Sequence, residues 1–151
     1  MNVGDVCQHQ VVTTPPSAGL SAAARVMRQE HVGYLVVVEP MAEEGRRKVV
    51  GVLTDRDIVI AVVAREADPR TLTVGDVMTR DPLLVNEHSP LDTTLSFMQE
   101  AGVRRVPVLD SSGALAGVLA LDDALKVIAL ELDKIAGCIA SEQKVERCVR
   151  A

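Results

Sequence analysis

The sequence predicts a mixed α/β protein of the α+β class, built from two β-α-β-β-α repeats. Two observations support this prediction. A four-residue segment near the N-terminus recurs 71 positions later, and each copy is followed by the same succession of extended and amphipathic segments. The 151 residues suffice for one ordinary domain or for two small repeats that share a core. A composition of 48 % hydrophobic and 25 % charged residues is typical of a globular protein.

The duplication can be followed through most of the chain. Val3-Gly4-Asp5-Val6 aligns with Val74-Gly75-Asp76-Val77, and no gap is needed from residue 3 to residue 39. The offset then falls to 66, where Gly51-Val52-Leu53 meets Gly117-Val118-Leu119. Repeat 1 therefore has five extra residues within the charged stretch 39–48, where a hairpin loop can lengthen at small cost. We expect repeat 1 at residues 1–66, a linker at 67–73, repeat 2 at 74–132 and a C-terminal helical extension at 133–151.

Both repeats predict a short extended segment followed by an amphipathic helix. The extended segments are residues 11–13 and 83–85. The helices have side chains at i, i+3, i+4 and i+7 on one face: Leu20, Ala23, Ala24 and Met27 in repeat 1, and Leu91, Thr94, Leu95 and Met98 in repeat 2. Ser89-Pro90 predicts the start of the second helix, with serine as N-cap and proline at the first helical position.

Two strands and a second helix complete each repeat. The strands are residues 34–38 and 49–53 in repeat 1, and 105–109 and 114–119 in repeat 2. Residues 58–64 are apolar on all sides, so this helix should be covered. An apolar stripe continues beyond the length that repeat 2 requires, at Leu125, Ile128, Ala129, Leu132, Ala136 and Ile139. We expect a second copy of the chain to cover these helices, the alternative being packing within one chain. Residues 141–147 predict a short helix that is either exposed or packed against a partner.

Charge and composition argue against several classes of function. The net charge of −5 offers no basic excess for nucleic acid, and Tyr34 and Phe97 are too few aromatic residues for base stacking. No run of about 18 apolar residues predicts a membrane span, and the first ten residues do not resemble a signal peptide, so we expect a cytoplasmic protein. Cys7, Cys138 and Cys148 should be free thiols, and their spacing predicts no metal site.

The segment Gly51-Val52-Leu53-Thr54-Asp55-Arg56-Asp57 leads from a buried strand into a helix. It has a structural interpretation, in which Thr54 is the N-cap and Asp57 completes a capping box. It also has a functional one, in which the helix N-terminus and Arg56 bind an anion while Asp57 accepts the hydroxyls of a ribose and Thr54 donates to a sugar or phosphate oxygen. The residues alone leave both interpretations open.

The duplicated unit with its Gly-x-x-Thr-x-x-Asp motif resembles the CBS-domain family. The chain as a whole resembles a tandem CBS pair, or Bateman module, of the small stand-alone bacterial kind that includes hypoxia- and stress-associated proteins. The resemblance covers about residues 3 to 132 and rests also on Val103-Arg104-Arg105-Val106-Pro107-Val108 in repeat 2. It implies two repeats related by a pseudo-twofold axis, with two clefts that bind AMP, ADP, ATP or sometimes S-adenosylmethionine or NAD. It also implies a homodimer, in which two modules form a disc of four repeats.

The resemblance assigns roles to particular residues. Asp57 is expected at the ribose hydroxyls, Thr54 between ribose and phosphate, and Arg56 at the phosphate. The remaining expected nucleotide-binding residues come from strands and their edges: Arg104 and Arg105 facing phosphate, Pro107 after them, and Val12, Thr13 and Tyr34 lining the adenine pocket.

Repeat 2 departs from the motif. Asp123 keeps the ribose carboxylate, but Ala120 lacks the threonine hydroxyl, a loss of about 1 kcal/mol or roughly fivefold in affinity. Asp122 stands where repeat 1 has Arg56, which places an anion near the phosphate. We therefore expect one competent site at Thr54 and Asp57, and a weaker or empty second site with Asp123, Ala120 and Val85.

These observations predict a regulatory module and not an enzyme. The histidines His9, His31 and His88 are scattered, and no nucleophile, base and metal set is apparent. The module would bind AMP, ADP or ATP between its repeats, would need no cofactor, and would signal to an unidentified protein by a shift in conformation. The alternatives are a ligand-free dimerising interaction protein, in which Thr54 and Asp57 only cap a helix, and a protein that binds another adenosyl ligand such as S-adenosylmethionine.

Overall fold

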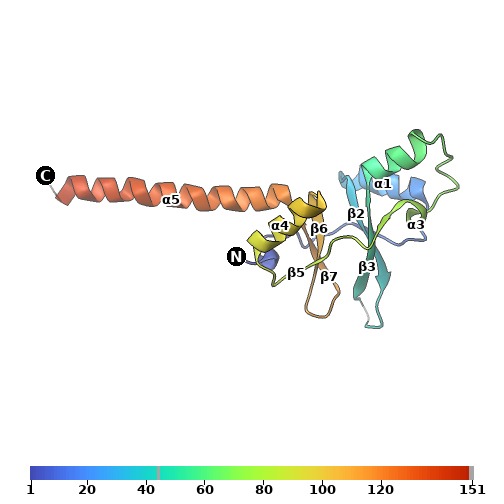
Figure 1. The fold of residues 1–151 in the computed structure, drawn as a ribbon, viewed down its shortest axis with the longest axis horizontal. Helices are drawn as coiled ribbons and strands as arrows, with labels where there is room; N and C mark the ends of the chain where they lie inside the picture. The colour runs from blue at the N-terminus through green and yellow to red at the C-terminus, as the bar shows by residue number, and fades with distance from the viewer. Residues whose placement is uncertain (44, 150–151) are drawn as a thin grey trace.

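The repeats fold into two small sheets with helices packed against them, and one long helix projects from the second repeat (Figure 1). The computed structural model describes residues 1–43 and 45–149. The elements of repeat 1 are η1 (Val3–Asp5), β1 (Thr13–Thr14), α1 (Leu20–Glu30), β2 (Tyr34–Pro40), β3 (Arg47–Thr54), α2 (Asp55–Ile58) and the π-helical turn η2 (Val59–Val63). Those of repeat 2 are α3 (Val74–Val77), β4 (Thr79–Arg80), β5 (Val85–Asn86), α4 (Leu91–Ala101), β6 (Arg105–Leu109), β7 (Leu115–Ala120) and α5 (Leu121–Val149).

Each sheet is built on an antiparallel hairpin with a short parallel strand beside it. In the first sheet β2 pairs with β3, Leu35 opposite Leu53, and β1 runs parallel to β2. In the second sheet β6 pairs with β7, Val106 opposite Leu119, and β5 runs parallel to β6. The four hairpin strands predicted from the sequence are confirmed, and their fully buried side chains are β-branched residues and leucines: Leu35, Val36, Val37, Leu53, Val106, Val108 and Leu119.

The two repeats exchange their first segments. Val3, Val6 and Cys7 pack into the core of repeat 2, whereas Val74 and Met78 pack into the core of repeat 1. The backbone follows the same exchange, because β4 pairs antiparallel with β3, and Gln8 forms the equivalent bridge to Val118. Each core is therefore completed by the other repeat.

Glycine is required where the exchanged segments cross the sheets. A Cβ atom on Gly51 would lie 2.7 Å from Met78 Sδ and 2.8 Å from the carbonyl oxygen of Thr79. A Cβ atom on Gly117 would lie 2.8 Å from both Cys7 Sγ and the carbonyl oxygen of Gln8. These separations are below van der Waals contact, so the two glycines that the repeat alignment superposes serve the same close approach.

The start of α4 corrects the sequence prediction. Pro90 and not Ser89 is the N-cap, and no side chain caps this end. The N–H of Leu91 donates to the carbonyl oxygen of Met1 at 3.2 Å, just as the N–H of Leu20 in α1 donates to that of Leu72 at 2.9 Å. The backbone of the exchanged segments thus satisfies these helix donors, and a capping side chain is not needed.

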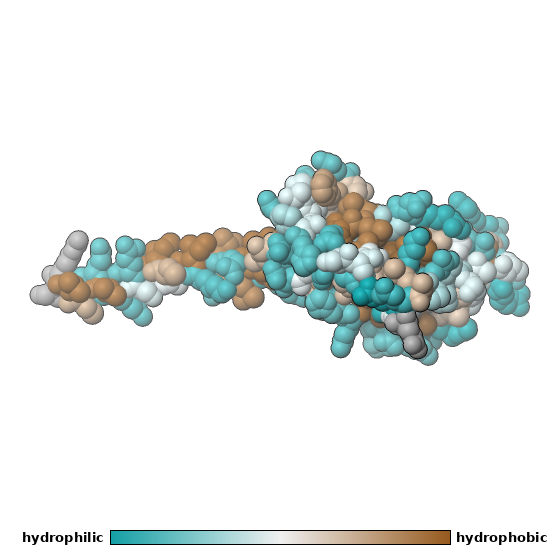
Figure 2. All heavy atoms as spheres, turned by 90° about the horizontal axis from the view of Figure 1, so that it is seen from below, coloured by the Kyte–Doolittle hydropathy of each residue, from teal (hydrophilic) through white to brown (hydrophobic). Residues whose placement is uncertain are grey.

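The second helices of the two repeats differ in length and exposure. α2 continues into η2, where Val59, Ile60 and Val63 are 54, 45 and 69 % exposed in the single chain. α5 is one continuous helix of 29 residues, so residues 141–147 are helical, but they form part of a long helix and not a short one. Its residues from 128 to 149 are exposed, and apolar side chains run along it in Figure 2. No helix among the described residues combines the length and apolarity needed to cross a bilayer.

Candidate functional site

The end of β3 and the start of α2 place Thr54 and Asp57 side by side. The backbone N–H of Asp57 donates to Thr54 Oγ1 at 3.1 Å, and the backbone N–H of Thr54 donates to Asp57 Oδ2 at 2.8 Å. The capping box predicted from the sequence is therefore confirmed. The cap uses one oxygen of each side chain, and the carboxylate oxygen Oδ1 of Asp57 is not needed for it.

This motif lines a cleft of about 750 Å³ between the two repeats. Repeat 1 contributes Tyr34 from β2 together with the four residues Thr54, Asp55, Arg56 and Asp57. Repeat 2 supplies the opposite wall, with the apolar residues Pro82, Leu83 and Val103 and the cations Arg104 and Arg105. The volume lies in the range of pockets for small organic ligands. We name this cavity the Thr54 cleft.

Three arginines and three aspartates line the Thr54 cleft, namely Asp55, Arg56 and Asp57 from repeat 1 and Asp81, Arg104 and Arg105 from repeat 2. Arg56, Arg104 and Arg105 line it and are exposed to solvent, so their guanidinium groups keep several free N–H donors. Arg104 Nη2 lies 3.6 Å from Asp122 Oδ1, a loose and exposed ion pair that a ligand anion can replace. Guanidinium groups bind phosphate oxygens in bidentate fashion, so the arrangement is suited to an anionic ligand.

A second cleft of about 340 Å³ is also lined by residues of both repeats. It is lined by Ala120 and Asp123, as expected, and by Lys126, whose Nζ lies 3.2 Å from Asp123 Oδ1. In repeat 1 the position of Lys126 is occupied by Ile60. The smaller volume and the lysine that already pairs with the carboxylate distinguish this Asp123 cleft from the Thr54 cleft.

The structure corrects where several expected site residues lie. Val12 lines the Asp123 cleft and not the Thr54 cleft, where its equivalent Leu83 is found. Thr13 lines neither cleft, and its Oγ1 accepts a hydrogen bond from Arg47 Nη1 at 3.0 Å. Pro107 and Val85 are buried in the core of the module and line neither cleft. Val12 and Leu83 are exchanged because each cleft lies between the repeats and the wall facing one motif comes from the other repeat. Pro107 and Val85 face the interior of the module and so do not reach either cleft.

Tyr34 and Arg105, which the offset of 71 residues superposes, line both clefts. The guanidinium carbon of Arg105 lies 5.9 Å from the centre of the Tyr34 ring, within the range of a cation–π contact. The Tyr34 hydroxyl is buried, and no group among the described residues forms a hydrogen bond with it. Burial raises the pKa of Tyr34, with Arg105 acting in the opposite direction, so the hydroxyl keeps its proton and remains a donor.

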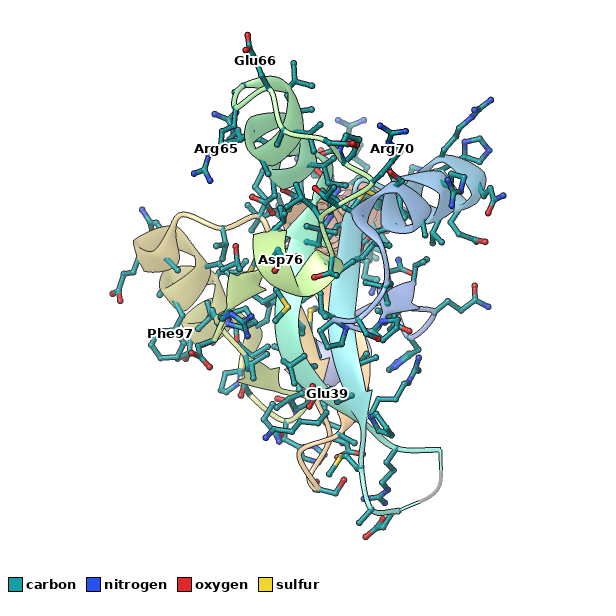
Figure 3. The ribbon with its side chains drawn as sticks, turned by 90° about the vertical axis from the view of Figure 1, so that its right-hand side faces the viewer. Glu39, Arg65, Glu66, Arg70, Asp76 and Phe97 are labelled. Atoms are coloured by element: carbon teal, nitrogen blue, oxygen red, sulfur yellow. The ribbon has the colours of Figure 1, made fainter. Side chains whose placement is uncertain are left out.

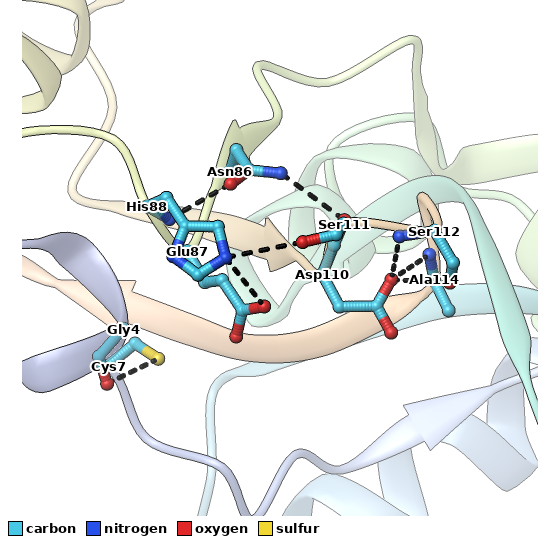
Figure 4. A network of polar contacts seen from close by, with 9 residues as sticks. All are labelled: Gly4, Cys7, Asn86, Glu87, His88, Asp110, Ser111, Ser112 and Ala114. Carbon is cyan, nitrogen blue, oxygen red and sulfur yellow. Dashed lines mark hydrogen bonds and ion pairs between the residues drawn. The ribbon is translucent and has the colours of Figure 1, made fainter.

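The histidines and cysteines lie apart from the Thr54 cleft. Figure 4 shows His88 in the turn between β5 and α4, its Nε2 3.2 Å from Oγ of Ser111 in the β6–β7 turn and 3.6 Å from Glu87 Oε1. His31 lines the Asp123 cleft at the end of α1. Cys7 is buried in the module whereas Cys138 is exposed on α5, and no group of three metal-ligating side chains occurs among residues 1–43 and 45–149.

Sequence reasoning missed Leu83 and Lys126 as cleft residues. Lys126 follows Asp123 by three positions on one helix, a spacing that predicts an ion pair, so a signal for it was present. Leu83 could not be assigned to the cleft from the sequence. Its apolar side chain indicates no particular chemistry, and its position depends on the exchange between the repeats.

Comparison with known protein families matches both repeats. The family model described as "CBS domain" matches residues 3–64 and again residues 74–130. The chain is 36 % identical over 121 residues to hypoxic response protein 1 of Mycobacterium tuberculosis, covering 79 % of this chain and 75 % of that protein. It is 34 % identical over 122 residues to the CBS domain-containing protein YhcV of Bacillus subtilis, covering 81 % of each.

Two further comparisons concern length and fold. The chain is 30 % identical over 127 residues to the uncharacterized protein MK0525 of Methanopyrus kandleri, covering 84 % of this chain but only 62 % of that relative. A solved structure of the CBS domain pair of protein MJ0100, in complex with 5′-methylthioadenosine and S-adenosyl-L-methionine, superposes with a TM-score of 0.72. The identity is 23 %, over 87 % of this chain and 98 % of that one, so this likeness shows a shared fold.

Proposed function

Because the chain belongs to the CBS-domain family, we propose that it is a regulatory module that binds an adenine nucleotide in the Thr54 cleft. The observation that supports this most directly is the joint construction of the cleft. A carboxylate at a helix start and an arginine come from repeat 1, and two further arginines and apolar wall residues come from repeat 2. The MJ0100 domain pair, which binds two adenosyl compounds, supports the ligand class.

Each part of the proposed ligand has a matching group in the cleft. The phosphates of AMP, ADP or ATP lie against Arg56, Arg104 and Arg105, whose charges offset those of the nucleotide. The ribose hydroxyls donate to the carboxylate of Asp57. The adenine ring lies between aliphatic side chains such as Leu83 and Val103, because Tyr34 is the sole aromatic residue that lines this cleft among the described residues.

Signalling follows from the fact that both repeats form the cleft. A ligand that contacts both stabilises one relative orientation of the repeats and shifts the population toward it. A partner protein that recognises that orientation then responds to nucleotide concentration. We assign the protein no chemical step and no cofactor, and we propose that it acts in the cytoplasm.

The proposal includes a homodimer. Val59, Val63 and Phe97 are apolar and 48 to 69 % exposed in the single chain, and Figure 3 shows Phe97 on the outer side of α4. A second module packed against these helices would cover them and form a disc of four repeats.

A second candidate function is a ligand-free interaction protein. It is favoured by one observation: the hydrogen bonds of Thr54 and Asp57 form a complete capping box without any ligand. In this case the cleft residues serve stability alone, and the helices that expose apolar side chains carry the interaction.

The chain contains a matched control that separates the two functions. Asp76 caps α3 as Asp57 caps α2, because the N–H of Thr73 donates to Asp76 Oδ2 at 2.8 Å, but Asp76 lines neither the Thr54 nor the Asp123 cleft. The experiment is calorimetric titration of Asp57→Ala, Asp76→Ala and the unchanged chain with AMP, ADP, ATP and S-adenosylmethionine, after removal of co-purified ligand. We expect about one nucleotide bound per chain, lost in Asp57→Ala and retained in Asp76→Ala. Absence of binding to the folded, unchanged chain would favour the interaction protein.

A further inference from the structure

Helix α5 carries an apolar stripe that extends beyond the two repeats. Leu125, Ile128, Leu132, Ile135 and Ile139 follow one another at alternating intervals of three and four residues. They are 40 to 67 % exposed, although they are leucines and isoleucines on one side of a helix. In proteins most of the stability of a helix comes from packing of its apolar face, so this stripe calls for a surface that covers it.

The spacing of the stripe identifies what packs on it. Intervals of three and four correspond to the a and d positions of a heptad, with Leu125, Leu132 and Ile139 at a and Ile128 and Ile135 at d. This pattern fits a second helix with the same pattern, and α5 of another copy supplies one. Within residues 125–139 the charged side chains Lys126, Asp133 and Lys134 lie at b and c positions, off the stripe, whereas Glu142 at d and Glu146 at a end the apolar contact after Ile139.

The residue types at and beside the stripe indicate more than two helices. Leucine at a combined with isoleucine at d favours three- and four-stranded assemblies over two-stranded ones. The flanking e and g positions, which usually carry charges in two-stranded coiled coils, are Ala129, Glu131, Ala136 and Cys138. The one charge among them, on Glu131, is paired with Lys134 of the same helix at 2.7 Å. The apolar face is therefore wide enough for each helix to contact two neighbours.

We propose that four copies of the chain assemble through a four-helix bundle formed by their α5 helices. The pairing of α5 helices rests on the stripe, whereas the number four also rests on the proposed disc, since two discs contribute two helices each. The module regions then lie at the ends or the sides of a common helical stem.

Light scattering coupled to size-exclusion chromatography tests the bundle on the full chain. Reductant is included because Cys138 and Cys148 are exposed. The unchanged chain should have the mass of four chains, and Leu132→Lys should have the mass of two. Leu130→Lys is the matched control: Leu130 and Leu132 are each 61 % exposed, but Leu130 lies at position f on the opposite side of the helix. It should retain the mass of four chains.

A second stripe variant, Ile139→Lys, is included because Ile139 lies far along α5 from the module and its replacement should not affect folding of the module. It should also halve the mass. An unchanged chain of any other mass would overturn the four-helix bundle, as would retention of four chains by both Leu132→Lys and Ile139→Lys. Equal dissociation of Leu130→Lys would overturn it too, because the effect would not follow the stripe. If the unchanged chain has the mass of four chains and both stripe variants have the mass of one, the α5 helices alone hold the four copies together. That result would support the bundle and contradict the proposed disc.

Discussion

Replacing Gly51 by alanine tests whether the crossing of the exchanged segments holds the repeats together. The new methyl group would lie 2.7 Å from Met78 Sδ and 2.8 Å from the carbonyl oxygen of Thr79. The methionine can move aside, but the carbonyl belongs to the backbone that pairs β4 with β3 and cannot move without loosening the contact. Overpacking of this kind costs about 1–3 kcal/mol.

An opposing effect must be subtracted. Alanine restricts the unfolded chain more than glycine does, which stabilises the folded state by about 0.4–1 kcal/mol where the backbone conformation is compatible. The steric cost is larger, so we expect a net loss of about 1–2 kcal/mol in the free energy of unfolding. With a urea dependence of about 2 kcal/mol per molar, the midpoint falls by roughly 0.5–1 M.

Urea unfolding followed by far-UV circular dichroism measures this shift. Gly117→Ala, at the equivalent crossing, should behave in the same way, because its Cβ would lie 2.8 Å from the carbonyl oxygen of Gln8. Gly19→Ala is the control, since no atom lies within 4 Å of its Cβ position. A midpoint for Gly51→Ala equal to or above that of the unchanged chain would refute the argument from close approach.

Three further predictions follow from other features. Tyr34→Phe removes a buried hydroxyl that has no hydrogen-bond partner among the described residues, so the free energy of unfolding without ligand should rise by about 1 kcal/mol; a lower value in urea titrations would contradict this. Gly137→Ala fills a helix position with open space around it and should raise helix content and stabilise α5 by up to about 1 kcal/mol, as measured by circular dichroism. Hydrogen bonds from Ser112 and Ala114 lower the pKa of Asp110, so its contribution to stability is complete above pH 3.8 and is lost as the pH falls through the lowered value; Asp110→Asn should make the acid unfolding curve less steep, and an unchanged curve would argue against it.

Local patterns in the sequence predicted much of the fold. The strand 105–109 matches β6 because its β-branched residues are buried and bounded by the polar residues Arg104 and Asp110. Strand β4 was not predicted, because Thr79 and Arg80 become a strand only by pairing with β3 of the other repeat. The helix at 141–147 was expected to be short, but it continues from Leu121 without interruption, because Gly137 is tolerated in the interior of α5.

The candidate site likewise has one part that local sequence predicts and one part that depends on packing between the repeats. Thr54 and Asp57 are three residues apart, and their mutual hydrogen bonds follow from local geometry that a sequence can indicate. The exchange of Val12 and Leu83 between the two clefts follows from the packing of one repeat against the other, which no single motif encodes. The resemblance pointed to the residues at the start of α2 and also to Tyr34, Arg104 and Arg105, which line the same cleft, whereas Leu83 could be assigned to it only from the structure.

The exchanged segments also bear on how the protein is made. Repeat 1 leaves the ribosome first, yet its core stays open until Val74 and Met78 have been synthesised. Val3 and Val6 can in turn pack into their core only after β6 and β7 have been synthesised. The nascent chain therefore cannot finish one half and then the other, and a chain cut within residues 67–73 would leave two fragments that each lack a part of their own interior. Because each core contains residues of both repeats, we expect the chain to unfold in a single transition and not repeat by repeat.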